Sequence, residues 1–247
     1  MRPRLGTPST GAARKPVAAQ TGVRTDGLPG TLLGADDLVD RPERWAVRDR
    51  KVTLDTGRVV TVRRDRVASA SGSAFSRDVV VHPGAVGVIA LDDEDRILLV
   101  SQYRHPVGHR LLEPPAGLLD VDGEHYLDVA QRELAEEGHV RAADWRVLVD
   151  PFTSPGMTDE AVRIFLARRL HSVPVDERFV GEHEEADLPI CWAPLDAVVS
   201  AVLTGGVHNP LLVIGALACF AARRTTGLDR LRAADAPWRV RQDLPHH

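Results

Sequence analysis

The sequence is poor in aromatic residues and in cysteine, and it has no long apolar segment. Phe, Trp and Tyr make up 4% of the 247 residues against 43% hydrophobic residues, so the core must be mainly aliphatic. The two cysteines, Cys191 and Cys219, lie in apolar surroundings without metal-site spacing. This pattern predicts buried thiols in a reducing cytoplasm. The longest apolar run, Leu211 to Ala222, is shorter than the roughly 20 residues of a spanning helix, so we expect no membrane partner.

An excess of positive charge is also missing. The 35 acidic residues outnumber the 31 basic ones and leave a net charge of -4, which argues against a general nucleic-acid partner. Residues 1–43 have no signal-peptide apolar segment and no period that would bury a face, and they are rich in Pro, Gly, Ala, Ser and Thr. We predict a disordered leader there. An organellar targeting sequence is the alternative, because the stretch carries arginine and few acidic residues.

The rest of the chain predicts an α+β fold in three parts. Residues 44–82 alternate as a small N-terminal β-subdomain, with a hairpin turn at Thr56-Gly57 and a strand over 77–82. Residues 83–226 interleave strands with one central helix and two final helices, and residues 227–247 form a C-terminal tail to which we assign no function. Strands are expected at 84–91, 96–102, 145–149, 161–170 and 188–192, a loop over 106–110 and a turn over 113–117, and helices at 195–204 and from Asn209-Pro210 to Arg224.

The central helix carries an unusual acidic face. At 100° per residue, Glu133 and Glu137 lie about 40° apart on the helical wheel, and Glu136 lies about 60° to the other side of Glu133. Carboxylates this close repel one another and destabilise an isolated helix. Oxygen ligands at this density suit Mg²⁺, with Mn²⁺ as the second choice. We expect Glu133 and Glu137 to be metal ligands because they share a face, and Glu136 to be a further ligand or the partner of one.

The segment from Gly117 to Val140 resembles the Nudix box. Arg132-Glu133-Leu134-Ala135-Glu136-Glu137 matches its centre, and Glu124 precedes Arg132 by the required seven residues. Two departures occur. Six residues rather than five separate Gly117 from Glu124, and His139 stands where the box ends in glycine. Because a helix end needs a residue that tolerates left-handed geometry, we expect Gly138 to end the helix one residue early.

Within the Nudix superfamily the chain resembles the ADP-ribose pyrophosphatases over roughly residues 44–225. A proline fifteen positions beyond the box is the marker of that family, and Pro155 occupies it. Gln102-Tyr103-Arg104-His105 and Glu113-Pro114-Pro115-Ala116-Gly117 resemble the family's segments around the substrate. The resemblance implies an α/β/α sandwich with a mixed sheet. It also implies a metal ligand from the carbonyl of Ala116 and a general base at Glu185, with Glu184 as the second choice.

Other residues receive roles from their chemistry. Glu124, Arg132 and Gly117 would brace the box. For Arg132 an ordinary ion pair with Asp128 is an equal alternative. Guanidinium groups fork onto phosphate oxygens, which makes Arg104 and Arg77 candidate phosphate ligands. The remaining candidate substrate-binding residues are Glu113, for an adenine amino group or a ribose hydroxyl, and Asp159 and Glu160 behind the Ser154-Pro155-Gly156 turn, for the terminal ribose.

These expectations combine into one reaction. The resemblance implies a cytoplasmic, Mg²⁺-dependent hydrolase that cleaves ADP-ribose to AMP and ribose 5-phosphate through water attack on the diphosphate. It also implies a homodimer in which the β-subdomain crosses over, so that Arg77 acts on the partner's site. Two alternatives stay open: hydrolysis of another nucleoside diphosphate derivative, and a non-catalytic ADP-ribose or nucleotide sensor.

Overall fold

The computed structural model describes residues 33–55, 59–69, 71–121, 123–179 and 188–244. The chain divides into two compact units, residues 1–43 and residues 44–247. In the first unit, Ala35–Asp37 form a 3-10 turn, and most of the predicted disordered leader lies outside the described residues. The second unit holds the strands and α-helices.

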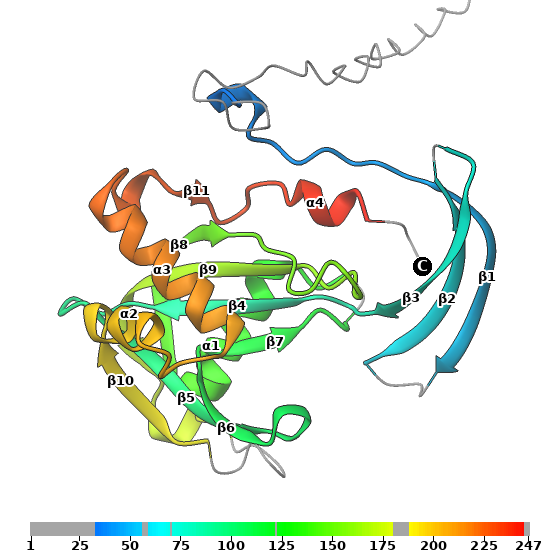
Figure 1. The fold of residues 1–247 in the computed structure, drawn as a ribbon. Coiled ribbons are helices and arrows are strands. Elements are labelled where there is room, and N and C mark those ends of the chain that lie inside the picture. The colour runs from blue at the N-terminus through cyan, green and yellow to red at the C-terminus, as the bar shows by residue number, and fades with distance from the viewer. Residues whose placement is uncertain (1–32, 56–58, 70, 122, 180–187, 245–247) are drawn as a thin grey trace, which may run out of the picture. The chain divides into compact units, whose positions relative to one another are not determined.

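The second unit begins with a three-stranded antiparallel sheet, which stands beside the larger sheets in Figure 1. Its strands are β1 (Ala46–Asp55), β2 (Thr61–Ala68) and β3 (Ala74–Val81). The predicted strands are therefore present, and the predicted turn at Thr56-Gly57 lies outside the described residues. Every residue of β1 is exposed, on both faces of the strand.

Two further sheets form the body of the unit. A five-stranded sheet has the order β11-β8-β9-β4-β7, and a three-stranded sheet has the order β10-β5-β6. The β4–β9 pair is parallel, whereas the other pairs are antiparallel. This confirms the mixed sheet. The strands are β4 (Ala85–Ala90), β5 (Arg96–Arg104), β6 (His109–Glu113), β7 (Ala116–Leu118), β8 (Val140–Val149), β9 (Val162–Ser172), β10 (Ile190–Pro194) and β11 (Arg232–Ala233).

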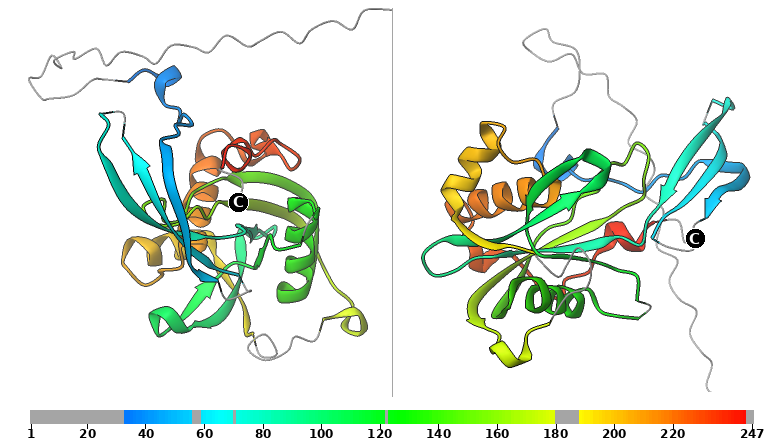
Figure 2. Two further views of the ribbon diagram at one scale, coloured as in Figure 1. Left: turned by 90° about the vertical axis from the view of Figure 1, so that its right-hand side faces the viewer. Right: turned by 90° about the horizontal axis from the view of Figure 1, so that it is seen from below.

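The helices cover both faces of these sheets. They are α1 (Tyr126–Gly138), α2 (Leu195–Leu203), α3 (Pro210–Arg224) and α4 (Arg239–Gln242). Seen from below in Figure 2, the green α1 lies on one side of the strands and the gold and orange α2 and α3 lie on the other. Among the described residues, no helix combines the length and the apolar character needed to cross a membrane.

Alternation along the central strands divides the core into two layers. Ile89 of β4 and Leu99 of β5 pack with α2 and α3, while their neighbours Val88 and Leu98 pack with α1. Successive strand residues point to opposite faces, so a strand covered on both sides must be apolar throughout. All six residues of β4 are buried. The α/β/α sandwich expected from the sequence is confirmed.

Two segments differ from the predictions. The loop expected over 106–110 and the turn expected over 113–117 overlap with β6 and β7, because β6 pairs with β5 and β7 pairs with β4. These pairings are tertiary, and the short segments show little alternation of their own. In the part beyond residue 227, β11 adds to β8 and Trp238 is buried.

The prediction that Gly138 takes the left-handed conformation at the end of the helix is wrong. Gly138 is the last helical residue, and His139 takes the left-handed conformation with φ 53° and ψ 30°. Gly138 cannot easily be replaced by a larger residue, because a Cβ there would lie 3.2 Å from Leu98 Cδ1. The chain therefore places a non-glycine residue in the conformation that ordinarily favours glycine.

This geometry gives a stability prediction for His139. His139→Gly should raise the free energy of unfolding by about 1 kcal/mol relative to His139→Ala, because glycine removes the steric penalty of the left-handed region. Urea unfolding followed by circular dichroism measures this difference. The alanine variant removes the imidazole in the same way, so it isolates the backbone effect, and equal stabilities of the two variants would contradict the prediction.

Candidate functional site

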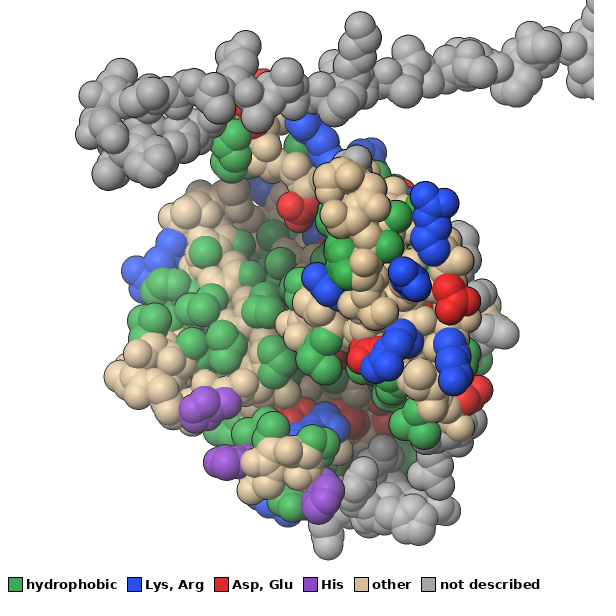
Figure 3. All heavy atoms as spheres, turned by 45° about the vertical axis from the view of Figure 1, so that its right-hand side comes forward, with side chains coloured by type: hydrophobic (Ala, Val, Ile, Leu, Met, Phe, Trp, Pro, Cys, Tyr) green, Lys and Arg blue, Asp and Glu red, His purple; other side chains and the backbone are tan. Residues whose placement is uncertain are grey.

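A polar cleft of about 800 Å³ lies beside α1. In Figure 3, acidic and basic side chains meet in a hollow in the lower half of the molecule, next to hydrophobic side chains. The cleft draws residues from separate parts of the chain: the end of β3, strands β5 to β7, helix α1, the loop before β9 and the start of α3. Nine of the residues that line it have roles predicted from the sequence: Arg104, Glu113, Ala116, Gly117, Glu124, Arg132, Glu133, Glu137 and Glu160.

Glu133 is seated against Gly117. A Cβ built on Gly117 would overlap the carboxyl group of Glu133, so glycine is the residue that leaves room for it. The Glu133 side chain is mostly buried, with 14% exposed, and its Oε1 accepts a hydrogen bond of 2.8 Å from Arg132. Gly117, the first residue of the box, therefore allows β7 and α1 to approach each other closely.

Glu137 reaches the same strand one residue earlier. Its Oε2 accepts a hydrogen bond of 3.0 Å from the backbone N–H of Ala116. The residues at 116 and 117 in β7 are therefore each in contact with one of the two carboxylates that share a helical face. This brings together Ala116, Glu133 and Glu137, which the sequence had grouped as metal ligands.

Arg132 binds three carboxylates at once. It contacts Glu124 at 3.4 Å, Glu133 at 2.8 Å and Glu136 at 3.3 Å. Partial burial lowers the pKa of the guanidinium, but the hydrogen bond with Glu124 and the charges of Glu133, Glu124 and Glu136 outweigh burial and raise the pKa above its usual value. Of the two roles open for Arg132, the geometry favours the brace, because its partners are the box glutamates rather than Asp128.

The carboxylates do not form a preassembled metal cage. Among the residues that the structure describes, no three His, Cys, Asp or Glu side chains lie close enough together to hold a metal ion. Of the three glutamates within one turn of α1, Glu136 does not line the cleft and its carboxylate accepts a hydrogen bond from Arg132, whereas Glu133 and Glu137 both line the cleft. Two carboxylates suffice for Mg²⁺, which keeps several waters and uses substrate oxygens for the rest of its shell.

Arg104 and Glu113 form a two-point ion pair on the cleft wall. Arg104 Nε and Nη2 donate to Glu113 Oε1 at 2.9 Å and to Oε2 at 2.6 Å. The glutamate side chain is 3% exposed, whereas the arginine side chain is 45% exposed. The buried Glu113 carboxylate therefore orients Arg104, whose guanidinium remains accessible from the cleft.

Glu160 also lines the cleft and takes part in a short chain of polar contacts. Thr153 Oγ1 donates a hydrogen bond to Glu160 Oε2, and Glu160 Oε1 lies 3.6 Å from His82 Nδ1. The His82 Nδ1 also accepts a hydrogen bond of 3.0 Å from the N–H of Gly84. These contacts fix the loop before β9 to the end of β3.

Three of the predicted substrate residues lie outside this cleft. Arg77, Gly156 and Asp159 line a separate hollow of about 530 Å³ between β2, β3 and the loop before β9. Asp159 Oδ1 accepts a hydrogen bond of 2.9 Å from the N–H of His82, and Arg77 lies over the ring of Phe75 at 4.3 Å. One chain therefore does not bring these residues together with Arg104 and Glu133.

The two candidate bases, Glu184 and Glu185, lie outside the described residues. The sequence gave no role in a functional site to His82, Gln102 and Asn209, which also line the cleft. Asn209 stands at the predicted start of a helix, and its side chain accepts a hydrogen bond of 3.0 Å from the N–H of Leu212 as the N-cap of α3. Gln102 belongs to a segment that resembles the family, while His82 had no signal beyond its place at a strand end.

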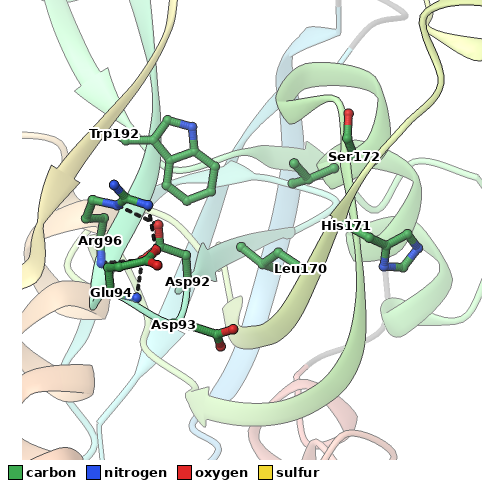
Figure 4. Close-up of a pocket in the computed structure, with 9 residues that line it drawn as sticks. Asp92, Asp93, Glu94, Arg96, Leu170, His171, Ser172 and Trp192 are labelled. Carbon is green, nitrogen blue, oxygen red and sulfur yellow. Dashed lines mark hydrogen bonds and ion pairs between the residues drawn. The ribbon is translucent and has the colours of Figure 1, made fainter.

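A further hollow at the turn between β4 and β5 is unrelated to the box (Figure 4). Its acidic side chains satisfy the turn itself, since Asp92 Oδ1 accepts hydrogen bonds from the N–H groups of Glu94 at 3.1 Å and Arg96 at 2.8 Å. The Arg96 guanidinium pairs with Asp92 and Glu94 at 2.6 Å each. We assign this hollow no chemistry.

The seat of Glu133 gives a prediction for Gly117. Gly117→Ala should displace the Glu133 carboxylate and lower kcat/KM for a diphosphate substrate by about 100-fold, a loss typical of removing one fixed charge from a transition-state site. Gly206→Ala is the matched control, because a Cβ there comes no closer than 3.5 Å to its neighbours. Steady-state kinetics and thermal melts of both variants would test this, and unchanged activity of Gly117→Ala would contradict it.

Comparisons with known proteins agree with this geometry. The family model described as NUDIX domain matches residues 81–211. An ADP-ribose pyrophosphatase of Mycobacterium tuberculosis (strain ATCC 25618 / H37Rv) is 45% identical over 186 residues, which cover 75% of this chain and 87% of that relative. An ADP-ribose pyrophosphatase of Bacillus subtilis (strain 168) is 39% identical over 134 residues, which cover 54% of this chain and 71% of that relative.

A solved structure extends the likeness to the fold. The crystal structure of an ADP compounds hydrolase aligns with a TM-score of 0.64 over 76% of this chain and 99% of that one, at 20% sequence identity. The family model matches residues 81–211. This range contains the close contact of Glu133 with Gly117 and the ion pairs of Arg132 with the box glutamates. On these grounds the chain belongs to the Nudix hydrolase family.

Proposed function

We propose that this protein hydrolyses ADP-ribose to AMP and ribose 5-phosphate, with Mg²⁺ as its cofactor and Mn²⁺ as a substitute. The observation that carries the proposal is the cleft in which two box carboxylates, Glu133 and Glu137, face the same space as the accessible guanidinium of Arg104. Its volume of about 800 Å³ lies in the range of nucleotide-sized sites. The names of the two bacterial relatives support the choice of substrate.

Glu133 and Glu137 would hold the metal ion, together with the backbone of Ala116. When bound, the ion neutralises charge on the diphosphate oxygens and lowers the pKa of a water molecule. Glu136 would remain with Arg132, whose positive charge offsets the repulsion among the three glutamates. Gly117 keeps the Glu133 carboxylate close to β7, so the two ligands are held before the substrate arrives.

Arg104 would bind the diphosphate. A guanidinium forks onto phosphate oxygens as it does onto a carboxylate, so the geometry that now serves Glu113 also suits a phosphate. Glu113 is buried and cannot follow the guanidinium out of the wall. We therefore assign Glu113 to orienting Arg104, while a direct contact with adenine or ribose remains its second role. Glu160, which also lines the cleft, would accept hydrogen bonds from ribose hydroxyls.

The proton of the attacking water would go to Glu185, with Glu184 as the alternative. A carboxylate that binds a metal ion is a poor base, because the cation stabilises its charged form. A base from a separate segment avoids this loss. The support for these residues is the resemblance of His183-Glu184-Glu185-Ala186-Asp187 to the family segment that holds the base.

Product analysis tests the reaction and its two key carboxylates. Wild-type protein with ADP-ribose and Mg²⁺ should release AMP and ribose 5-phosphate, and water labelled with ¹⁸O should place the label on phosphate. Glu133→Gln and Glu185→Gln should each lower kcat by at least about 100-fold, the scale of losing a fixed charge or a general base. Glu94→Gln is the control, since the side chain of that glutamate is 67% exposed and pairs with Arg96 of the same turn, away from the cleft.

Two other outcomes would redirect the proposal. Tight ADP-ribose binding without turnover would indicate a nucleotide sensor. Turnover of another nucleoside diphosphate derivative, at a higher kcat/KM than that of ADP-ribose, would keep the hydrolase chemistry and replace the substrate.

We also propose a cytoplasmic homodimer in which Arg77 of one chain completes the cleft of the other. The cytoplasmic location rests on the two free cysteines. The dimer rests on β1, where Val47, Val52 and Leu54 are about half exposed, and on the position of Arg77 in a hollow separate from the box cleft. Apolar side chains on an open sheet commonly mark a contact surface between chains.

Complementation tests the shared site. Arg77→Ala and Glu133→Gln homodimers should each be nearly inactive, whereas co-expressed and randomly mixed chains should regain about a quarter of wild-type activity, because half of the dimers are mixed and each holds one intact site. Activity that stays at the level of the single variants after mixing would place Arg77 in the site of its own chain or outside it. Sedimentation velocity on the mixture confirms that dimers are present.

A further inference from the structure

The segment after β9 and α3, from residue 232 to residue 244, is built into the body of the protein. Its first residues, Arg232–Ala233, pair with β8 as strand β11. Trp238 in its middle is among the largest fully buried side chains, with 1% of its surface exposed. A buried aromatic residue of this kind removes about 150–250 Å² from solvent, and this sequence has only four tryptophans.

Arg163 of β9 anchors the segment. This arginine is 1% exposed, and its Nε and Nη2 donate to Asp150 at 2.8 and 3.0 Å. The guanidinium also donates to the carbonyl oxygens of Ala236 at 2.7 Å and Pro237 at 3.3 Å. Its Cζ lies 4.9 Å from the centre of the Trp238 ring. A buried cation with this many partners holds the backbone before Trp238 in one position.

Trp238 packs against Tyr126, the first residue of α1. The two rings lie edge to face, with centroids 5.0 Å apart and an angle of 86° between their planes. Arg241 adds contacts of 5.7 Å to the Tyr126 ring and 5.6 Å to the Trp238 ring. Glu133 follows Tyr126 by two helical turns, about 10 Å along the axis, so a shift at the start of α1 moves both carboxylates.

The start of α1 has weak local support. Its N-cap is His125, whose Nδ1 accepts a hydrogen bond of 3.3 Å from the N–H of Leu127, and histidine is not among the preferred N-cap residues. Val121 in the preceding loop is 58% exposed, and a Cβ on Gly123 would meet nothing within 4 Å. The position of the helix start therefore depends on the Arg132–Glu124 ion pair and on contacts with more distant parts of the fold.

We propose that residues 232–244 act as a C-terminal clamp on the carboxylate helix, with Trp238 as a positioning residue for Glu133 and Glu137. The inference rests on the proposed metal role of these two glutamates. The clamp joins Asp150, Arg163, Trp238 and Tyr126 in one chain of contacts that ends at α1. In this proposal the clamp sets the distance between α1 and Gly117 of β7.

We assign the positioning of α1 to the aromatic ring of Trp238 rather than to its indole N–H. Its Nε1–H is buried and finds no acceptor among the described residues. A buried donor without a partner costs free energy, so phenylalanine at this position keeps the aromatic contact and loses an unfavourable group. Trp238→Phe is therefore the matched control for Trp238→Ala.

Calorimetric titration of the full-length protein with Mn²⁺ alone tests the clamp. Trp238→Ala should weaken Mn²⁺ binding by about 10-fold, the lower end of what loss of an outer partner of a metal ligand produces, and Trp238→Phe should stay within about twofold of wild type. In Mg²⁺ titrations of activity, the half-saturating Mg²⁺ concentration should rise in the alanine variant while the KM for ADP-ribose changes little. Hydrogen exchange should speed up at the first turn of α1.

The outcomes separate the clamp from the proposed function. Wild-type protein that binds no Mn²⁺ would refute the metal role of Glu133 itself, whereas equal binding by wild type and folded Trp238→Ala would overturn only the clamp. Equal losses in Trp238→Phe and Trp238→Ala would also overturn it. If Trp238→Ala does not fold, Tyr126→Leu removes the other side of the same contact and should weaken Mn²⁺ binding in the same way; unchanged binding in that variant would likewise overturn the clamp.

Discussion

The repulsion among the box glutamates is the constraint on which the site depends. Three carboxylates within one turn of α1 would destabilise the helix if left alone. Arg132 offsets part of this repulsion by binding Glu133 and Glu136 on the helix and Glu124 in the loop before it. Gly117 and the Ala116 N–H then receive Glu133 and Glu137 at β7. The acidic face therefore costs stability in isolation and becomes tolerable only between an arginine and a close strand.

The other charged groups of the cleft are likewise stabilised by protein partners. Its charged groups are already paired with protein partners: Arg104 with Glu113, Glu160 with Thr153, and Glu133 with Arg132. Most of these pairs are partly buried, where an unpaired charge would be expensive. A diphosphate and its metal ion would replace some of these partners rather than fill a set of free charges. Such an exchange favours ligands that carry both signs of charge at once, as a metal–diphosphate complex does.

The sequence was a good guide where a local pattern carries the information. The apolar runs at 84–91 and 96–102 predicted the strands β4 and β5, and the spacing of Glu133, Glu136 and Glu137 predicted one acidic face. It failed at His139, because the residue that takes the left-handed conformation is chosen by how tightly Gly138 packs on Leu98. It also missed β6 and β7, whose short strands exist only through pairing with β5 and β4.

The sequence by itself determined the family, the sandwich and the carboxylates of the helix, because motif spacing and hydrophobic period are properties of the chain. Only the tertiary structure decided which partners those carboxylates have and which candidate residues share a cleft. It put Arg104 and Glu160 with Glu133 but left Arg77 and Asp159 in another hollow, and it turned the C-terminal segment into part of the core through Trp238 and Arg163. The reason is physical: contacts between residues far apart in the chain depend on how the sheets and helices pack, and no local pattern records that packing.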